Sequence, residues 1–592
     1  MGLLPATGQR SRSQRLIRAG ILTALITGGL VMALPFLLMF SGATRTGVDA
    51  HSFTLLPRFL TQDSVLFQKY IEAKYNESPA LLRATWETDI ATFDEVTLLA
   101  TPDRELVATW ETFLETYPLQ KEEHLVGFSH TPSSRSRPWL VRRFLNHQRK
   151  RSNGDISALN DRLNTSFPSW NAFQVLPPNG RTREGYIEPS PWWNAWFDFI
   201  ERDAPEWSLG IHNLTGFYHE RVTRNQQGRD ALRVLISEGV AYQRETFIRG
   251  LVHPAFMQIS PQASSEWQVF LKARHGSLDG LEQATGLTPS SWDDLSLPSS
   301  YESAGQLQAD WMAFIEGWID LETDTLLQAP LESISLRSAE LEWRTQTGSA
   351  PPFREWDQVL FERHTSEIRK VFLTQNFAAA YEILIRDGRG LWVTLLYCAG
   401  SVFLALLVNP LAAYALSRFR PKHTYTILLY LLLTMAFPPM VTQIPLFLML
   451  RDFGMLNTFW ALWLPGMVHG YSIFLLKGFF DSLPQDLYES ASLDGASELR
   501  MFTTITMGLS KPILAVIALQ AFVTAYTAFM FALLICQDQQ MWTVMVWLYQ
   551  LQQTYGPGVQ NAAYVLAAIP TLLAFLLAQR HILKGIVIPT EK

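Results

Sequence analysis

Cysteine is almost absent from this chain, which has two among its 592 residues, Cys398 and Cys536. Both lie inside apolar stretches, where a thiol is more often a small buried hydrophobe than a disulfide partner or a metal ligand. Residues 43–387 contain no cysteine. Thiol redox chemistry and thiolate metal sites are therefore excluded from that segment.

Other signatures are missing as well. The pattern Gly-x-x-x-x-Gly-Lys-Ser/Thr, which holds nucleotide phosphates, does not occur. His253, His275 and His364 lack the spacing of metal ligands. A formal net charge of −6 argues against a nucleic-acid partner. The sequence predicts no cofactor, no metal and no nucleotide site in this chain.

Long apolar runs are confined to the two ends of the chain. A helix needs about 20 largely apolar residues to span a bilayer, and residues 43–387 hold no such run. The first run is also compatible with a cleaved signal peptide, but it exceeds the roughly 7–15 residues of a signal h-region. We therefore predict an all-α membrane protein with six transmembrane helices: Leu16–Phe40, Leu391–Leu416, Tyr425–Leu450, Thr458–Leu476, Pro512–Cys536 and Ala562–Leu577.

Basic residues in the short flanks of these spans predict the orientation, because they favour the cytoplasmic side. They precede the first span, follow the second and the sixth, and separate the fourth from the fifth, so a cytoplasmic N-terminus puts every group inside. Three parts follow. Residues 1–42 carry the first helix, residues 43–387 form a large, mainly helical extracytoplasmic insertion, and residues 388–592 form the membrane core.

The cytoplasmic loop between the fourth and fifth spans has the pattern of a helical hairpin. Ser482 is placed to cap a helix that begins at Pro484. Gly495 is placed to end that helix with a positive φ. A second helix from Ala496 would put Leu499, Phe502 and Ile505 along one side, as an apolar ridge. From the residues alone, an ordinary solvated loop is an equal alternative.

This loop resembles the coupling loop of ABC importer permeases, whose pattern is Glu-Ala-Ala, three residues, then Gly. Glu489-Ser490-Ala491 and Asp494-Gly495-Ala496 match it with one conservative change, and Ile505 matches the later isoleucine. Met507-Gly508 stand where Leu-Pro is usual. The resemblance extends over residues 388–592 and is specific to the maltose-type carbohydrate permeases, binding-protein-dependent inner membrane components.

The resemblance implies a function and a set of partners. It implies a bacterial inner membrane permease subunit that is not itself an enzyme, imports a sugar or oligosaccharide and couples alternating access to a partner ATPase. That ATP-binding dimer would hold ATP and Mg²⁺, while a second permease and an extracytoplasmic solute-binding protein would complete the complex within membrane lipid. The residues that match or adjoin the coupling motif are Glu489, Ser490, Ala491, Asp494, Gly495, Ala496, Phe502 and Ile505.

The fifth span departs from the family pattern. Relatives usually have Gly-Ala-Trp-Asn-Glu-Phe where this chain has Thr-Ala-Tyr-Thr-Ala-Phe over residues 524–529, so an amide and a carboxylate are absent. Gln520, Thr524, Tyr526 and Thr527 remain as polar groups that could face a translocation path. Uncharged polar groups in membrane helices more often join helices to each other, which is the alternative.

Residues 43–387 contain an internal repeat. Copies begin at Tyr70, Phe144 and Phe270, each with a helix, a turn, a short helix and an aromatic residue, and a degenerate copy ends near Trp356. We expect the aromatic to pack on the next helix, at Trp110, Trp196 or Trp311. Acidic pairs such as Asp293/Asp294 fit helix caps. A membrane-tethered, glycan-active enzyme and a ligand-sensing receptor stay open as alternative functions.

Overall fold

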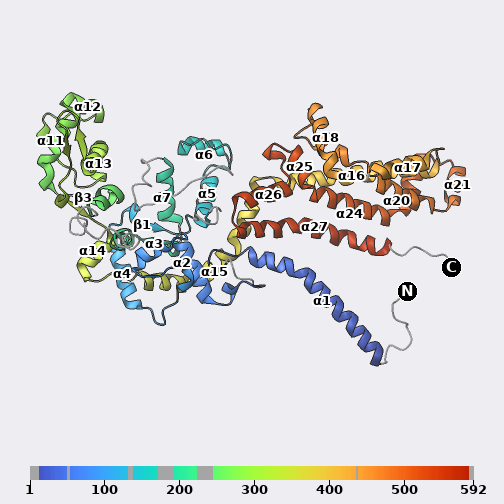
Figure 1. The fold of residues 1–592 in the computed structure, drawn as a ribbon, viewed down its shortest axis with the longest axis horizontal. Helices are drawn as coiled ribbons and strands as arrows, with labels where there is room; N and C mark the ends of the chain where they lie inside the picture. The colour runs from blue at the N-terminus through green and yellow to red at the C-terminus, as the bar shows by residue number, and fades with distance from the viewer. Residues whose placement is uncertain are drawn as a thin grey trace, which may run out of the picture. The chain divides into compact units, whose positions relative to one another are not determined.

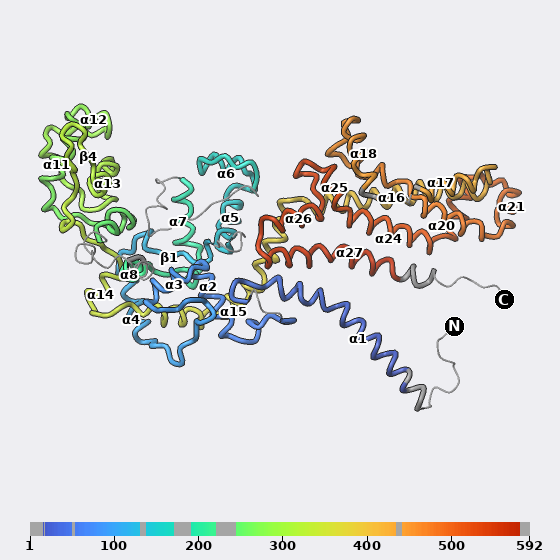
Figure 2. The backbone as a smooth tube through the Cα atoms, in the orientation of Figure 1, coloured from blue at the N-terminus to red at the C-terminus, as the bar shows by residue number. Residues whose placement is uncertain are grey.

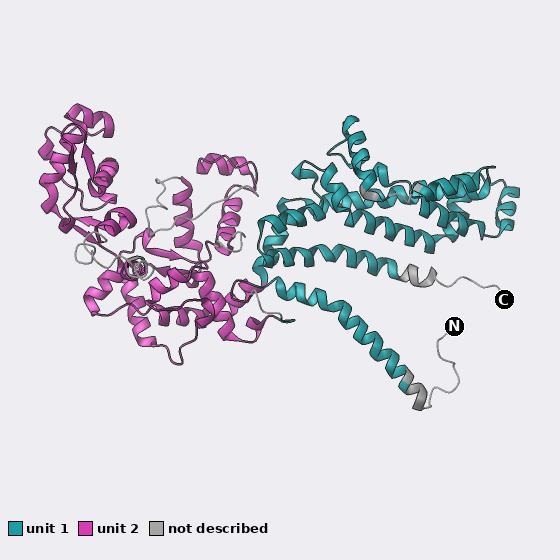
Figure 3. Ribbon diagram, in the orientation of Figure 1, with its two compact units in different colours: residues 1–45, 53–56, 374–592 teal, residues 46–52, 57–373 magenta. Residues whose placement is uncertain are grey.

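The computed structural model describes residues 12–49, 54–130, 138–170, 191–222, 244–434 and 438–585. The chain divides into two compact units (Figure 3). Unit 1 comprises residues 1–45, 53–56 and 374–592, and unit 2 comprises residues 46–52 and 57–373. The described residues are mostly helical, as predicted, and their strands are three residues long.

Unit 1 consists of apolar helices and short connecting turns. In chain order (Figure 1) its elements after α15 are the π-helical turn η12 (Glu382–Asp387), α16 (Gly390–Arg418), α17 (Thr424–Thr434), α18 (Pro439–Asp452), α19 (Phe459–Trp463), η13 (Leu464–Gly466), α20 (Gly470–Asp481), α21 (Gln485–Leu493), α22 (Glu498–Arg500), η14 (Met501–Thr506), α23 (Met507–Leu509), α24 (Lys511–Thr527), α25 (Phe529–Ile535), η15 (Gln539–Met541), α26 (Val544–Thr554) and α27 (Pro557–Gly585). They are preceded by α1 (Arg12–Gly42).

Three of the six predicted spans are single long helices. The segments Arg18–Gly42, Gly390–Arg418 and Pro557–Gln579 are each long and apolar enough to cross a membrane. They correspond to the first, second and sixth predicted spans. Within the part of the chain that the structure describes, up to five crossings result if each bent helix pair counts as one. The predicted count of six is not confirmed.

The other three predicted spans are broken, and proline lies at the break in two of them. In the third, α17 and α18 are separate helices, and Pro438 and Pro439 precede α18. In the fourth, Pro465 lies in η13, and the helices on either side are bent by 50°. Proline lacks the amide hydrogen that an uninterrupted helix requires, which favours breaks at these positions; Pro410 and Pro570 nevertheless lie inside α16 and α27. The fifth ends as α24 at Thr527, and α25 follows after Ala528.

Helix α16 is the centre of unit 1, with α20 and α24 running beside it (Figure 2). Its glycines bring aromatic side chains close. A Cβ at Gly400 would lie 2.2 Å from Trp463, and one at Gly390 would lie 2.5 Å from Trp547. Both indoles donate hydrogen bonds to carbonyls of this region, Trp463 to Tyr397 at 3.0 Å and Trp547 to Gly388 at 3.1 Å. Small residues permit this close packing of helices in an apolar setting.

Unit 2 is helical apart from three short antiparallel strand pairs, β1–β2, β3–β6 and β4–β5. Its elements are η1 (Arg58–Leu60), α2 (Asp63–Lys74), α3 (Pro79–Trp86), η2 (Phe93–Glu95), α4 (Arg104–Thr116), η3 (Lys121–Glu123), β1 (His124–Val126), α5 (Trp139–Arg151), α6 (Ile156–Leu163), α7 (Pro191–Asp203), η5 (Glu206–Ser208), β2 (Leu209–Ile211), α8 (Leu214–Val222), η6 (Phe247–Leu251), η7 (Pro254–Phe256), β3 (Met257–Ile259), η8 (Pro261–Ala263), α11 (Ser264–His275), α12 (Leu278–Thr285), η9 (Trp292–Asp294), η10 (Glu302–Leu307), α13 (Gln308–Glu316), β4 (Trp318–Asp320), β5 (Thr325–Leu327), η11 (Leu331–Ser333), β6 (Ile334–Leu336), α14 (Ala339–Thr347) and α15 (Phe353–Tyr381).

The order of these elements repeats along unit 2. Two copies have a helix, a short helix, a 3₁₀ turn with an aromatic residue, and a further helix: α2–α3–η2–α4 and α11–α12–η9–α13. Between them, α5 and α6 are followed by Trp170 and then α7, with residues 171–190 outside the described part. A 3₁₀ turn and a short strand also follow, as η3–β1, η5–β2 and η11–β6. Three-residue strands give no periodic signal, so the sequence did not predict them.

The tryptophans of the repeat are core residues and lie in the same apolar clusters as the aromatic residues of the turns. Trp110, Trp196 and Trp311 are buried. Among the described ring contacts, Trp110 meets Trp343 at 5.1 Å and Trp196 meets Phe144 at 5.1 Å, so neither pairs with the aromatic residue of its own turn. Asp294 does act as a cap, because its carboxylate accepts the Ser291 amide at 2.8 Å.

A buried carboxylate joins three helices of unit 2. One oxygen of Asp357, on α15, accepts the Tyr75 hydroxyl at 2.6 Å and the Trp86 indole at 2.8 Å. The other oxygen is 2.7 Å from Nζ of Lys74, whose side chain is 0% exposed against 2% for Asp357. The Trp356 ring lies 5.2 Å from the same ammonium. A buried ion is tolerated only when it is paired and hydrogen-bonded, and this cluster meets both conditions.

Replacing Asp357 with Asn should destabilise unit 2 by about 3–5 kcal/mol, because Lys74 stays buried without its counter-ion. Hydrogen exchange of peptides that cover residues 63–86 measures the loss in the full-length protein. The control is Glu362→Gln, which removes the partner of the 71% exposed Arg104 and should cost at most about 1 kcal/mol. Equal exchange in the two variants would contradict the role given to Asp357.

Candidate functional site

The loop after α20 is a compact hairpin built around one turn. Helix α21 ends at Leu493, and Gly495 has a φ of +78°, as the sequence predicts. The Ala496 amide donates to the Ala491 carbonyl at 2.9 Å, and the Gly495 amide donates to Ser492 at 3.0 Å. A Cβ at Gly495 would meet open space, so backbone conformation and not crowding requires the glycine.

The ends of the two helices differ from the prediction. Ser482 does not cap α21; its hydroxyl donates to the Phe479 carbonyl at 2.6 Å and so belongs to the end of α20. Helix α21 follows Pro484 with no side-chain cap. The second arm begins at Glu498 and not at Ala496, and Ser497 caps it by accepting the Arg500 amide. Pro484 follows Leu483 and has an extended backbone, with a ψ of 127°, which separates α20 from α21.

The predicted apolar ridge on the second arm is wrong. Phe502 is only 7% exposed and Ile505 is half-buried, and both pack inside unit 1. Leu499 is 69% exposed and Leu493 is 89% exposed, so the outward apolar side chains flank the turn. Residues 501–506 form a π-helical turn, which rotates Phe502 and Ile505 away from the face that α-helical spacing predicts.

The other motif residues lie on the outer side of the hairpin. Glu489, Ser490, Asp494 and Gly495 are exposed. The remaining two, Ala491 and Ala496, are half-buried where the two arms meet. The Glu489 carboxylate accepts the side-chain amide of Gln485 at 2.9 Å, a pair at i,i+4 on one face of α21. The motif therefore places two carboxylates, a hydroxyl and the turn itself on the accessible surface.

Polar contacts tie the hairpin to the last turns of α16. The Tyr414 hydroxyl donates to the Glu498 carboxylate at 2.7 Å, and the Tyr414 ring lies 5.2 Å from Phe502. Ser417 donates to Asp481 at 2.6 Å, at the end of α20. These contacts join α16 to the start and to the second arm of the hairpin, so the three elements form one connected structure.

The first arm is held by a stacked cation. The Arg418 guanidinium lies 4.0 Å from the centre of the Tyr488 ring. The Tyr488 hydroxyl and the Thr506 hydroxyl are 2.8 Å apart, which links the first arm to the π-helical turn. A cation over an aromatic face contributes about 0.5–2 kcal/mol, depending on how far it is desolvated. The sequence did not predict this cluster, because its members are up to 88 positions apart.

The bend before α20 is bonded to the middle of α16. Asn409 is fully buried in α16; its side-chain amide donates to the Met467 carbonyl at 3.3 Å, and its oxygen accepts the His469 amide at 2.9 Å. These are the backbone groups that the break at η13 leaves without helical partners. In an apolar setting such groups must be satisfied within the protein, and Asn409 satisfies two of them.

The four polar residues of α24 divide into two sets. Gln520, Thr524 and Thr527 are exposed and lie on one face, at spacings of four and three. Tyr526 is buried and its hydroxyl donates to the Ala567 carbonyl of α27 at 2.5 Å. Tyr526 therefore joins two helices, and only the other three share an accessible face.

The hairpin and the helices around it lie in a region that matches a known protein family. A family model described as binding-protein-dependent transport system inner membrane component matches residues 405–587, which include the whole hairpin. The trehalose/maltose transport system permease protein MalG of Thermococcus litoralis is 36% identical over 202 residues, covering 32% of this chain and 73% of that protein. This chain belongs to that family. The family is one of inner membrane permease subunits.

Other relatives of this permease family align over the same region. Similar proteins include the polygalacturonan/rhamnogalacturonan transport system permease protein YtcP of Bacillus subtilis, 32% identical over 34% of this chain and 74% of its own length. The galactooligosaccharides transport system permease protein GanQ of Bacillus subtilis is 35% identical over 33% and 69%. A solved bacterial ABC transporter for import of the acidic polysaccharide alginate aligns at 24% identity and a TM-score of 0.31, over 34% and 78%.

Histidine, cysteine and acidic residues of the described ranges are the residue types that could bind a metal ion. No group of three or more His, Cys, Asp and Glu side chains in the described ranges is arranged to hold a metal ion. His275 instead lies 3.1 Å from Asp310, and His253 caps η7 by accepting the Ala255 amide.

A double-mutant cycle should detect the bond between the hairpin and α16. Tyr414→Phe and Glu498→Gln should each loosen residues 485–509, and the double variant should be no worse than either single one. The expected coupling is about 1 kcal/mol, since Glu498 is exposed and its hydrogen bond is screened by water. Hydrogen exchange of that segment is the measurement, and strictly additive effects would mean that the two groups act independently.

Proposed function

We propose that this chain is the permease subunit of an ATP-driven importer for a carbohydrate, and that its hairpin couples a partner ATPase to the membrane helices. The geometry of the hairpin supports this most directly. Its exposed turn at Gly495 carries two outward leucines, and its base is bonded to α16 through Tyr414 and Glu498. A force applied to the turn would therefore act on α16.

The residues that would contact the ATPase are those on the outer side of the hairpin. Glu489, Ser490, Asp494 and Gly495 are accessible, together with the two leucines that flank the turn. Phe502 and Ile505 take the different role of anchoring the hairpin inside unit 1. ATP and Mg²⁺ would be held by the partner subunits, and alternating access would follow from movement of α16 and its neighbours.

The choice of a carbohydrate rests on the relatives. Their names specify trehalose/maltose, galactooligosaccharides and polygalacturonan/rhamnogalacturonan. A second permease and an extracytoplasmic solute-binding protein would complete the complex, as the family description implies. The exposed face of Gln520, Thr524 and Thr527 on α24 is the part of the described chain that we assign to the translocation path.

The topology that fits this function places residues 1–42 with the first helix, residues 43–387 outside the cytoplasm and residues 388–592 in the membrane core. The compact unit 2 ends at Leu373, because the last part of α15, residues 374–381, belongs to unit 1. Protease added to sealed inside-out vesicles should leave unit 2 intact, and protease added to spheroplasts should cleave it. Cleavage in the inside-out vesicles would contradict this orientation.

Gly495 provides the test of coupling. Gly495→Val puts a β-branched residue at positive φ and should strain the turn by about 1–3 kcal/mol. Gly495→Asn is the matched control, because asparagine tolerates this conformation. In vesicles reconstituted with the partner subunits, the Val variant should lose carbohydrate uptake and solute-stimulated ATP hydrolysis, while the Asn variant should retain most of both.

Glu489→Gln should have a milder effect than Gly495→Val, since it removes a charge but keeps the shape of the side chain. Full uptake and full stimulated hydrolysis in the Gly495→Val protein would sink the coupling role of the hairpin. Assembly of the complex is checked separately by co-purification, so a loss of activity is not confused with a loss of the complex.

A further inference from the structure

A polar pocket lies within unit 2, between the end of α4 and one face of α14. Its volume is about 550 Å³, within the roughly 300–1,000 Å³ typical of small-molecule sites. Phe113 and Tyr117 line one wall, and Glu342 and Gln346 line the wall formed by α14. Gln258 in β3 and Arg337, the residue after β6, also contribute. None of these residues belongs to the hairpin or to the membrane helices.

Arg337 gives the pocket an exposed positive charge. Its guanidinium interacts with the Tyr117 side chain and attracts the buried Glu123 carboxylate, but among the described residues no carboxylate lies within ion-pair distance of it. The guanidinium lies 5.7 Å from the centre of the Tyr117 ring. Its backbone amide donates to the Phe256 carbonyl at 2.8 Å, which fixes the main chain from which it extends.

A buried carboxylate joins the two walls. Glu123 accepts the Ala339 amide at 2.6 Å and the Gln120 amide at 3.2 Å, so the start of α14 is bonded to the segment that follows α4. The Tyr117 hydroxyl lies 3.4 Å from the same carboxylate. Burial, together with the nearby Glu123, raises the pKa of Tyr117 to about 12, so the phenol stays protonated and neutral.

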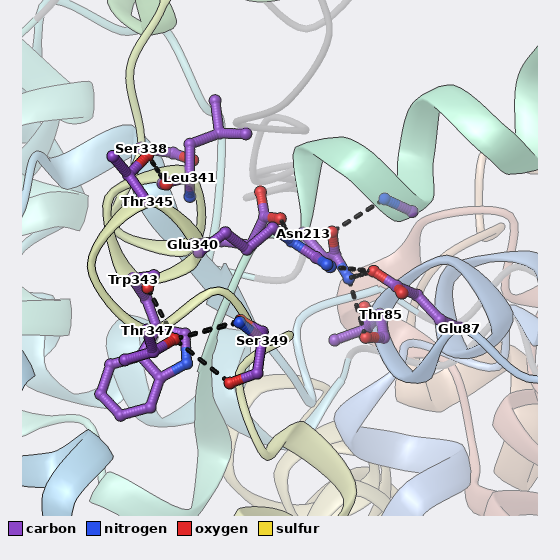
Figure 4. A network of polar contacts seen from close by, with 12 residues as sticks. Thr85, Glu87, Asn213, Ser338, Glu340, Leu341, Trp343, Thr345, Thr347 and Ser349 are labelled. Carbon is purple, nitrogen blue, oxygen red and sulfur yellow. Dashed lines mark hydrogen bonds and ion pairs between the residues drawn. The ribbon is translucent and has the colours of Figure 1, made fainter.

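The opposite face of α14 is held by a second polar network (Figure 4). Arg344 pairs with Glu340 on α14 and with Glu87 after α3. Glu87 also accepts the side-chain amide of Asn213 at 2.8 Å, and Asn213 accepts the Gly216 amide of α8 at 2.8 Å. Both faces of α14 are thus fixed, and the pocket is organised before any ligand arrives.

The chemistry of the walls selects among ligands. The Phe113 and Tyr117 rings are stacked 5.5 Å apart and offer an apolar surface. Gln346 donates to the Glu342 carboxylate at 3.0 Å, which occupies that carboxylate in part, and Gln258 supplies a further amide. A sugar ring has an apolar face and a hydroxyl edge that match these groups. A carboxylate is the partner that a guanidinium binds best, through two parallel hydrogen bonds.

We propose that this pocket binds a short saccharide that carries a carboxylate, with Arg337 bound to the carboxylate and Tyr117 in contact with the sugar ring. The choice of a saccharide rests on the proposed function, whereas the requirement for a negative charge rests on Arg337 alone. Unit 2 would then hold a ligand site of its own, separate from any path through the membrane helices.

Isothermal titration of the full-length protein in detergent with digalacturonate tests the proposal, with maltose as the uncharged probe. Digalacturonate should bind and maltose should bind at least tenfold more weakly. Arg337→Gln should weaken digalacturonate at least tenfold, about 1.4 kcal/mol. The matched control is Arg143→Gln, because Arg143 is also exposed and lies 5.6 Å from an aromatic ring, that of Trp139, outside the pocket.

Absence of digalacturonate binding, equal binding by the Arg337→Gln protein, or equal binding of maltose would each overturn the proposal. The titration needs no partner subunit and no ATP. A failure of the importer assignment would appear in the Gly495 variants and leave this titration interpretable, so the two ideas fail separately.

Discussion

Backbone groups freed by a break in an apolar helix have to be bonded within the protein, and the side chain of Asn409 meets that requirement for the bend before α20. Helix α20 leads directly into the hairpin, so the position of the hairpin depends on how this bend is held. Asn409 lies in the middle of α16, and Tyr414, Ser417 and Arg418 lie at its end. One helix therefore holds both the bend and the hairpin.

Unit 2 depends on the same principle with ionised groups. Asp357 forms an ion pair with a lysine and accepts hydrogen bonds from a tyrosine and a tryptophan, which come from two other helices. Glu123 accepts hydrogen bonds from backbone amides of two segments. In both cases a buried carboxylate is surrounded by donors from distant parts of the sequence. Such clusters select one packing of the repeated helices among the many that similar apolar faces would allow.

Local features were predictable from the sequence, and features that depend on distant partners were not. Uninterrupted apolar runs identified α1, α16 and α27, and the positive φ of Gly495 followed from its place after a helix. The breaks in the third and fourth spans coincide with proline, but the residue that satisfies the second of them, Asn409, is about 60 positions away. The inward position of Phe502 depends on a π-helical turn that α-helical spacing does not reveal. The roles of the motif residues in coupling rest on resemblance and stay predictions.

The two ends of unit 2 lie side by side. The Phe59 ring in η1 is 6.4 Å from the Phe372 ring in α15, the Lys69 ammonium lies 5.2 Å and 5.6 Å from these two rings, and Arg369 pairs with Asp63. A segment whose entry and exit are adjacent can be gained, lost or exchanged in a single genetic event, because only a short link is needed to rejoin the flanking chain. Unit 2 has the geometry of a module that can be inserted into a chain, or removed from it, without a change in the helices that flank it.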